Sequence, residues 1–349
     1  MGYRVIQCFT GAVGSAAIRL ATRDPRVDLV GVYVHHADKE GRDAGDLAGI
    51  PPIGIKATQN LDALLEAGAD CALWNGEWDG AVISKILRSG VNVYSGNHAY
   101  YLRSEPDFAA LQGACEEGGT TLAAGGNIPG LISDVTPLFL SGYTGSITQV
   151  RTWQRNHVPD LPSAMDLSDG VGFGLPCGDR TSFDSPIDRG WEGALRQSAQ
   201  MVADGLGADL DSFGISAKEV VPALDDLHLA HSGMTIEKGT VAGVRWQFTG
   251  IAAGRPFYQM HVEMTVALGL APGWRTSVEE ANWRIELDGT PDLVAEVSVP
   301  VPVGPGIIEL NAARAVNSVS RVVEAAVGCR SVLDFPAATG SAASNAVGH

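Results

Sequence analysis

The chain has 349 residues, of which 45% are hydrophobic and 18% charged, and its formal net charge is −16. Single hydrophobic cores rarely grow beyond ~250–300 residues, so this length predicts two domains. The acidic balance argues against a nucleic-acid partner, which needs a basic surface. No charged-then-apolar leader opens the chain and no apolar run reaches ~18 residues, so we expect a soluble, cytoplasmic protein without membrane contact.

The first 34 residues have the pattern of a dinucleotide-binding βαβ unit. An apolar run at 5–9 is followed by a glycine turn, a helical stretch at 15–22 and a second apolar run at 27–34. A glycine lets backbone approach a pyrophosphate, which the helix N-terminus attracts through its free N–H groups. Phe9 occupies the first position of the usual G-x-G-x-x-G, so an ordinary crossover with a tight turn is the alternative. The expected cofactor contacts in this turn are Thr10, Gly11, Ala12, Val13 and Gly14.

Strand and helix patterns alternate up to about residue 135. Strands are expected at 69–74, 91–94 and 120–124, with helices between them. This spacing predicts an α/β fold with a doubly wound parallel sheet of the Rossmann type. We assign residues 1–136 to this dinucleotide-binding domain.

The pattern changes near residue 137. Residues 244–249, 258–266 and 283–288 alternate strictly between apolar and polar, which predicts an antiparallel sheet with one buried face. We therefore expect a C-terminal α+β domain over residues 137–308, which serves substrate binding and oligomerisation. A helix within 309–336 is expected to return to the Rossmann domain, and the small, polar stretch 337–349 to form a flexible tail.

The residues after the second expected strand bear on the choice of cofactor. An acidic residue at the end of that strand would select NAD. Here His35 and His36 follow the strand, with Lys39 and Arg42 nearby, while Asp38 lies past the turn. We expect these four basic or imidazole side chains to contact the 2′-phosphate of NADP, with NAD as the alternative cofactor. A solvated surface turn of mixed charge is the other interpretation.

The segment after the expected strand at 91–94 is a candidate for catalysis, because ligands of open α/β sheets bind outside the carboxyl ends of strands. A histidine donates a proton near neutral pH, and a tyrosine hydroxyl hydrogen-bonds the same atom. His98, Tyr100 and Asn97 are therefore the candidate catalytic residues, and Tyr101 a candidate substrate contact. An ordinary loop with tyrosines packed between the domains is the alternative.

Two further segments contain residues that could contact the cofactor or the substrate. Residues 125–130 read GGNIPG after the strand at 120–124, which places Asn127 and Pro129 near the nicotinamide or in an interdomain hinge. In the second domain, Trp153, His157 and Phe173 are candidate substrate contacts, although a surface loop is the commoner role for such segments. Neither the histidines nor the five scattered cysteines form a metal-ligand pattern, so no metal is expected.

Six segments carry a family resemblance through their order and spacing. They are TGAVGSAA at 10–17, VGVYVHHADKEGRDAGDLAG at 30–49, GGNIPGLISD at 125–134, KGTVAGVRWQFTG at 238–250, GTPDL at 289–293 and AARAVNSV at 312–319. Over about residues 3–335 the chain resembles the dihydrodipicolinate-reductase-like superfamily, and within it 2,4-diaminopentanoate dehydrogenase and the native amine dehydrogenases. The resemblance implies an NAD(P)H-dependent homodimeric oxidoreductase. Such an enzyme transfers hydride between nicotinamide and an amine, imine or carbonyl carbon in an interdomain cleft.

The chain departs from that family at one motif. Amine dehydrogenases keep a glutamate in a Glu-Glu-x-x-Tyr-Pro-like motif after the strand that 91–94 resembles, whereas residues 96–101 here read GNHAYY. The paired histidines of dipicolinate reductases are also missing. We expect an amine-dehydrogenase-like enzyme acting on CH–NH2 or C=N bonds of a small molecule. The alternatives are a carbonyl or cyclic-imine reductase of a bulkier apolar substrate, and a non-catalytic NADP-binding sensor or scaffold.

Overall fold

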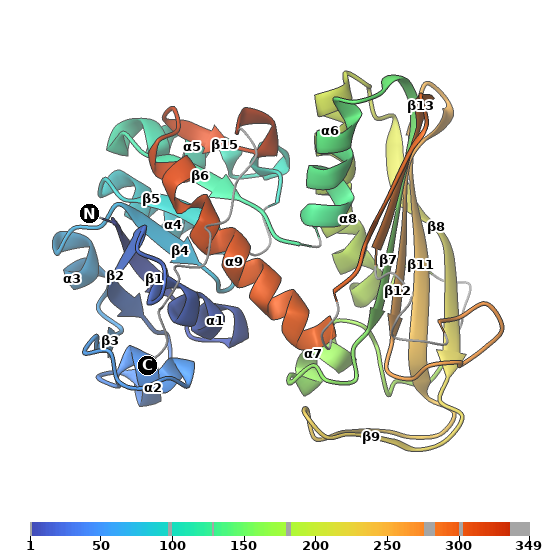
Figure 1. The fold of residues 1–349 in the computed structure, drawn as a ribbon, viewed down its shortest axis with the longest axis horizontal. Helices are drawn as coiled ribbons and strands as arrows, with labels where there is room; N and C mark the ends of the chain where they lie inside the picture. The colour runs from blue at the N-terminus through green and yellow to red at the C-terminus, as the bar shows by residue number, and fades with distance from the viewer. Residues whose placement is uncertain are drawn as a thin grey trace, which may run out of the picture. The chain divides into compact units, whose positions relative to one another are not determined.

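The computed structural model describes residues 2–96, 100–127, 129–178, 183–275, 283–299 and 303–335. The chain divides into two compact units (Figure 1). The first consists of Met1–Asn127 and Ile308–His349, and the second of Ile128–Ile307. No helix in the described ranges combines the length and apolar character that crossing a bilayer requires.

A seven-stranded parallel sheet forms the centre of the first unit, in the order β15-β6-β5-β4-β1-β2-β3. Its strands are β1 (Tyr3–Cys8), β2 (Val27–Tyr33), β3 (Ala57–Thr58), β4 (Cys71–Trp74), β5 (Asn92–Ser95), β6 (Thr121–Ala124) and β15 (Gly328–Arg330). The strand order reverses between β1 and β4, and such switch points are where open α/β sheets bind their ligands. The predicted Rossmann architecture is confirmed.

Helices cover both faces of this sheet, which explains why its strands are apolar on both sides. They are α1 (Ala12–Ala21), α2 (Ala44–Ala48), α3 (Leu61–Glu66), α4 (Gly80–Arg88), α5 (Phe108–Gly118) and α9 (Val303–Val323). Val5 packs on one face in a core shared with α1 and the buried stripe of α9. Its neighbour Ile6 packs on the other face with α4 and α5.

The second unit is built on a six-stranded sheet in the order β14-β13-β7-β12-β11-β8. Its strands are β7 (Gly145–His157), β8 (Ser212–Pro222), β11 (Val241–Ala252), β12 (Arg255–Thr265), β13 (Trp283–Thr290) and β14 (Leu293–Val297), and a separate hairpin pairs β9 (Leu227–Leu229) with β10 (Met234–Ile236). All its neighbours are antiparallel except β7 and β12. The predicted antiparallel sheet is therefore confirmed for most of its strand pairs, but β7 and β12 are parallel, which the alternation pattern does not reveal.

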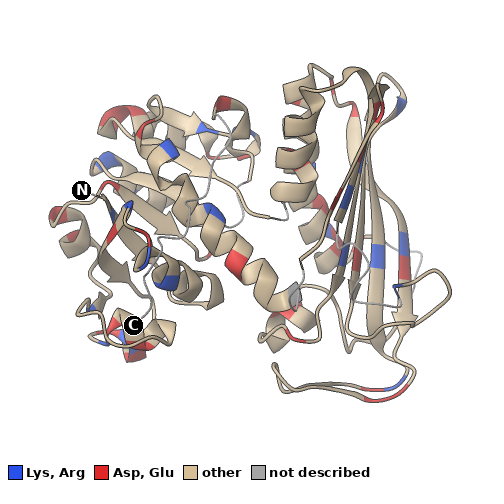
Figure 2. Ribbon diagram, viewed as in Figure 1, with Lys and Arg blue, Asp and Glu red and all other residues tan. Residues whose placement is uncertain are grey.

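Helices pack on one face of this second sheet. They are α6 (Thr136–Ser141) and α8 (Pro186–Leu206), with a π-helical turn at Leu131–Val135 before α6, and a short helix, α7 (Ala164–Ser168), follows β7 in the chain. On the α8 side, the Trp246 indole donates a hydrogen bond of 2.8 Å to Asp188. The opposite face carries ion pairs, such as Arg151 with Glu286 at 2.8 Å and with Asp288 at 2.7 Å. Basic and acidic positions both occur along the strands of this sheet (Figure 2). One face of the sheet is thus apolar and covered, and the other is charged.

Candidate functional site

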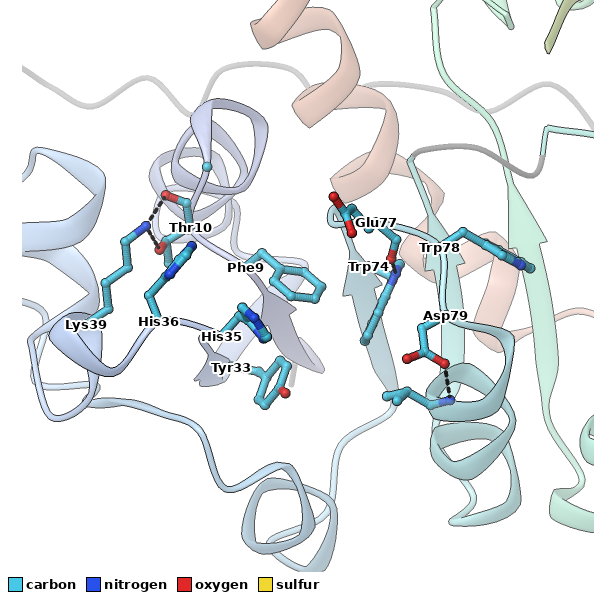
Figure 3. Close-up of a pocket in the computed structure, with 12 residues that line it drawn as sticks. Phe9, Thr10, Tyr33, His35, His36, Lys39, Trp74, Glu77, Trp78 and Asp79 are labelled. Atoms are coloured by element: carbon cyan, nitrogen blue, oxygen red, sulfur yellow. Dashed lines mark hydrogen bonds between the residues drawn. The ribbon is translucent and has the colours of Figure 1, made fainter. Parts of the chain in front are cut away.

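A cavity of about 580 Å³ lies at the carboxyl ends of β1, β2 and β4 (Figure 3). Its lining comes from three segments: residues 9–11 after β1, residues 33–39 at the end of β2, and residues 74–82 between β4 and α4. The cavity therefore opens beside the reversal of strand order in the first unit. Concave sites at such a switch point are suited to dinucleotides.

The two glycines of the first turn have different roles. Gly11 lines the cavity and precedes α1 with φ −71°, a conformation that any residue adopts, and a Cβ built on it would meet nothing within 4 Å. A Cβ on Gly14 would lie 2.3 Å from the carbonyl oxygen of Phe9. Gly14 therefore lets the helix pack against the strand end, whereas nothing in the described protein requires glycine at position 11.

The N-terminus of α1 is open to an anion. Gly11 provides no side-chain cap, and the first turn of the helix carries no acidic residue. Helix N-termini have unsatisfied N–H groups and a partial positive charge, which together attract phosphate. The turn thus fits the diphosphate of a nicotinamide dinucleotide.

Phe9 occupies the position of the first glycine in the G-x-G-x-x-G motif. Its backbone has a φ of 69°, a left-handed conformation that glycine adopts most easily. Its ring packs edge-on against Trp74, with centroids 4.8 Å apart, and against Tyr33, at 5.6 Å (Figure 3). Gly76 makes room for this ring, because a Cβ there would lie 2.3 Å from it. Aromatic packing therefore offsets the strain of the left-handed conformation, and the turn survives the loss of its first glycine.

The ribose end of the cavity has one well-placed cation. The Lys39 ammonium donates to the Thr10 hydroxyl at 3.1 Å, so it reaches back to the phosphate turn (Figure 3). His35 and His36 are exposed and also line the cavity. Arg42 is exposed as well, but it is not part of the lining. The structure thus brings three of the four proposed phosphate contacts to the cavity.

Acidic side chains near this end differ in their placement. Glu40 points to another turn, where it accepts hydrogen bonds from the Thr58 hydroxyl at 3.0 Å and from the backbone of Gln59. Glu77 and Asp79 line the cavity, and Asp79 caps α4. The sequence analysis did not assign residues 74–82, which line the cavity, to the site. These residues directly follow an expected buried strand, and that position could have indicated a site segment.

The candidate catalytic segment is described only in part. Asn97 and His98 lie outside the described residues. Tyr100 is partly buried, and Tyr101 is 1% exposed in the core of the first unit. Asn127 is 4% exposed, and its backbone N–H donates to the Asn311 side chain of α9 at 2.9 Å. Pro129 is buried and belongs to the second unit.

The substrate candidates of the second unit do not share one environment. Trp153 stacks on His261 with centroids 5.0 Å apart, and the strand register places both on the sheet face opposite Trp246 and α8. Burial, reinforced by nearby arginines, lowers the pKa of His261 to about 4. Burial also lowers the pKa of His157, which lies 3.3 Å from the Thr265 hydroxyl. Phe173, by contrast, is fully buried.

In the described part of the chain, no cluster of three or more histidine, cysteine or acidic side chains is arranged to hold a metal ion. All five cysteines carry free thiols.

The fold and the glycine turn of the first unit are those of a Rossmann-type dinucleotide-binding domain. Residues 132–347 match the family model of the 2,4-diaminopentanoate dehydrogenase C-terminal domain, and residues 5–73 match that of the dihydrodipicolinate reductase N-terminus. The first match covers more than half of the chain, which therefore belongs to the 2,4-diaminopentanoate dehydrogenase family. The resemblance inferred from the sequence is confirmed.

Individual relatives agree with this assignment. The chain is 28% identical to an amine dehydrogenase of Streptomyces virginiae over 94% of each protein. It is 23% identical to the 2,4-diaminopentanoate dehydrogenase of Acetoanaerobium sticklandii, over 73% of this chain and 69% of that protein. The structure of an amine dehydrogenase from Mycobacterium smegmatis has the same fold, with a TM-score of 0.77 over 98% of both chains at 19% identity. The chain is thus an amine-dehydrogenase-like oxidoreductase.

Proposed function

We propose that this protein uses NADP(H) to interconvert a small amine and the corresponding imine or carbonyl compound. The observation that carries the proposal is the uncapped N-terminus of α1, which opens at Gly11 onto the 580 Å³ cavity. The overall similarity to an amine dehydrogenase supports the class of reaction. When bound, the nicotinamide exchanges hydride with the substrate carbon. The chain's own residues bind the dinucleotide, orient the substrate and hold the accompanying proton.

The first test concerns dinucleotide binding at Gly11. Gly11→Val should lower NADP affinity at least tenfold, or ~1.4 kcal/mol, because the new side chain projects into the open space where backbone meets phosphate. Thermal unfolding should hardly change, since the backbone there is unstrained and a Cβ has no neighbour. Titration of NADP by fluorescence measures the effect.

Gly14→Ala is the matched control for this test, because its Cβ would strike the Phe9 carbonyl. That variant should be less stable, and its NADP binding should fall only to the extent that the protein is unfolded. Unchanged NADP binding in a folded Gly11→Val variant would remove this turn as the phosphate site.

We further propose that the cofactor is NADP rather than NAD. Lys39, His35 and His36 line the ribose end of the cavity, and Glu40 is engaged with Thr58 and Gln59. Lys39→Ala combined with His36→Ala should therefore erase a preference for NADP, whereas Arg42→Ala should leave most of it, because Arg42 is exposed and outside the lining. Competitive titration with both dinucleotides measures the ratio. Tighter binding of NAD by the unmodified protein would contradict the proposal.

A homodimer is proposed through the charged face of the second sheet. That face carries the Trp153–His261 stack among ion pairs such as Arg151 with Glu286, while α8 covers the other side. The mass in sedimentation should be twice 36.4 kDa. Arg151→Glu would leave three carboxylates together on this face of each protomer, with Glu286 and Asp288, so two such faces should repel each other and the mass should shift toward that of the monomer. A monomeric unmodified protein would exclude this assembly.

A further inference from the structure

A glutamine side chain is buried in β1, an inner strand of the first sheet. Gln7 is 1% exposed, and the other buried residues of this strand are Val5, Ile6 and Cys8. Burying a side-chain amide is costly unless its polar atoms find hydrogen-bond partners. The partners of the Gln7 amide therefore indicate what this residue does in the strand.

The amide nitrogen of Gln7 donates to two consecutive backbone carbonyl groups. Nε2 lies 2.6 Å from the carbonyl oxygen of Cys8 and 3.1 Å from that of Phe9. A side-chain amide has two N–H groups, so both hydrogen bonds can form at once. The two carbonyls belong to the peptide groups on either side of the Phe9 Cα atom, and the rotations between these groups are the φ and ψ angles of Phe9. One side chain therefore fixes the backbone conformation of Phe9.

Phenylalanine disfavours this conformation. The φ of Phe9 is 69°, in the left-handed region where glycine is the usual residue. The backbone N–H of Phe9 also donates to the Tyr33 carbonyl at 2.7 Å, but that bond restrains only the peptide group before Phe9. The bond from Gln7 to the Phe9 carbonyl restrains the peptide group that leads into the phosphate turn.

The Gln7 amide lies against the N-terminal turn of α1. A Cβ built on Gly14 would lie 3.0 Å from Nε2 of Gln7 and 2.3 Å from the Phe9 carbonyl oxygen. Asn75, which follows β4, orients the amide, because its Nδ2 donates to Oε1 of Gln7 at 3.4 Å. Since Oε1 is the acceptor in this bond, Nε2 is the atom that faces the two carbonyls.

We propose that Gln7 is a positioning residue for NADP binding, because it holds Phe9 in the left-handed conformation and thereby keeps the turn before α1 in the shape that receives the diphosphate. The inference rests on the proposed function and deepens it. A turn that adopts its binding conformation for only part of the time binds its ligand more weakly in proportion to that fraction. Loss of the Gln7 hydrogen bonds should therefore weaken NADP binding, although Gln7 itself need not touch the cofactor.

The test is a double-mutant cycle with Phe9. Gln7→Met keeps the length of the side chain and removes both donors, so the NADP affinity in fluorescence titration should fall about tenfold, or ~1.4 kcal/mol. In the Phe9→Gly background the same substitution should change the affinity by less than about threefold, because glycine adopts the left-handed conformation readily. The effect of Gln7→Met is compared within each background, so the loss of the Phe9 ring does not enter the comparison.

Gln112→Met is the matched control. The Gln112 side chain accepts from the backbone N–H of Cys329 at 2.9 Å, where α5 meets β15 in the same unit, and it is not part of the cavity lining. This variant should lose stability and keep its NADP affinity. Thermal unfolding of each variant establishes that it is folded before binding is compared.

A second variant, Asn75→Ala, applies if Gln7→Met does not fold. It removes only the hydrogen bond that orients the Gln7 amide, so the NADP affinity should fall by about threefold. This smaller loss should also disappear in the Phe9→Gly background. A direct contact between Asn75 and the cofactor would instead give the same loss in both backgrounds.

Three outcomes would overturn the inference. The first is normal NADP affinity in a folded Gln7→Met variant or, where that variant does not fold, in Asn75→Ala. The second is an equal loss of affinity with and without Phe9→Gly, which would mean that Gln7 does not act through the conformation of Phe9. The third is an equal loss in folded Gln112→Met, which would reduce the effect to general stability. Failure of the proposed function looks different, because the unmodified protein would then bind no NADP at all.

Discussion

Replacement of Asp188 by alanine is expected to destabilise the second unit by about 3–5 kcal/mol. The carboxylate is 0% exposed in the first turn of α8. It accepts from the Lys218 ammonium at 2.7 Å, from the Trp246 indole at 2.8 Å and from the Ser185 hydroxyl at 2.7 Å. Its removal leaves the Lys218 ammonium, only 14% exposed, without a counter-ion. Urea unfolding at neutral pH measures the loss.

The stability that the Asp188–Lys218 pair contributes depends on pH in a direction that follows from the pKa of Asp188. Burial alone would raise the pKa of Asp188, but hydrogen bonds from Lys218, Ser185 and Trp246 outweigh it and hold the pKa below its usual value. The stabilisation is therefore complete above the ordinary carboxyl pKa of ~3.9 and is lost as the pH falls through the folded-state value.

Asp225→Ala is the matched control for Asp188→Ala, because it removes an exposed aspartate–lysine pair of the same unit. Exposed pairs contribute little to stability, so this variant should unfold almost like the unmodified protein. Equal losses in the two variants would contradict the importance assigned to the buried pair.

The regular parts of the fold were predictable because their patterns are local. In residues 244–249 the apolar side chains of Val244, Trp246 and Phe248 alternate with polar ones, and all three are buried in β11. The βαβ unit of residues 3–34 was equally visible from its apolar runs and glycine turn. A period of two or a turn between two strands depends only on neighbours in the sequence.

Near the C-terminus, strand β15 was not predicted, whereas the helix expected within 309–336 was predicted but starts earlier than expected. Strand β15 has three residues, and only its pairing with β6, about two hundred residues earlier, makes it a strand. Helix α9 begins at Val303, before the expected start, and passes through residues 304–306, which read Gly-Pro-Gly. Such residues are poor helix formers in an interior but are tolerated in a first turn. Tertiary contacts decide both elements.

The site was predictable in outline and not in detail. The turn at Gly11 was recognised, but Trp74 comes sixty residues later and reaches the cavity only because β4 lies beside β1. Lys39 and Arg42 look equivalent in the sequence, yet only Lys39 contacts Thr10. The match of Phe9 with Gly76 depends on side-chain packing between two loops, which no local pattern records.

The largest effect on turnover is expected from the segment that leaves β5. Ser95, the last residue of this strand, pairs with Trp74 of the cavity on one side and with Ala124, just before the Gly125–Asn127 loop, on the other. The carboxyl end of β5 therefore lies between the end of β4, which lines the dinucleotide cavity, and that loop, and His98 and Tyr100 follow it in the sequence. This is also where the amine dehydrogenases keep their glutamate. We propose that His98 or Tyr100 supplies the proton that accompanies hydride transfer, with Asn97 assisting.

A positioned acid contributes typically ~10²–10⁴ in rate, so His98→Ala or Tyr100→Phe should lower the turnover number by about that factor with any working amine or ketone. NADP affinity should hardly move, because neither residue lies in the phosphate turn. Tyr143→Phe, which alters a tyrosine 67% exposed on the second unit, is the matched control and should turn over normally. Steady-state kinetics over a range of pH separates loss of a proton donor from loss of substrate binding, since only the loss of a proton donor moves one limb of the plot of kcat against pH.

Near-normal turnover in both variants would assign the proton to another group, His157 or a bound water. If no amine, imine or carbonyl compound changes nicotinamide absorbance while NADP still binds, the protein is a cofactor-binding sensor and not an enzyme.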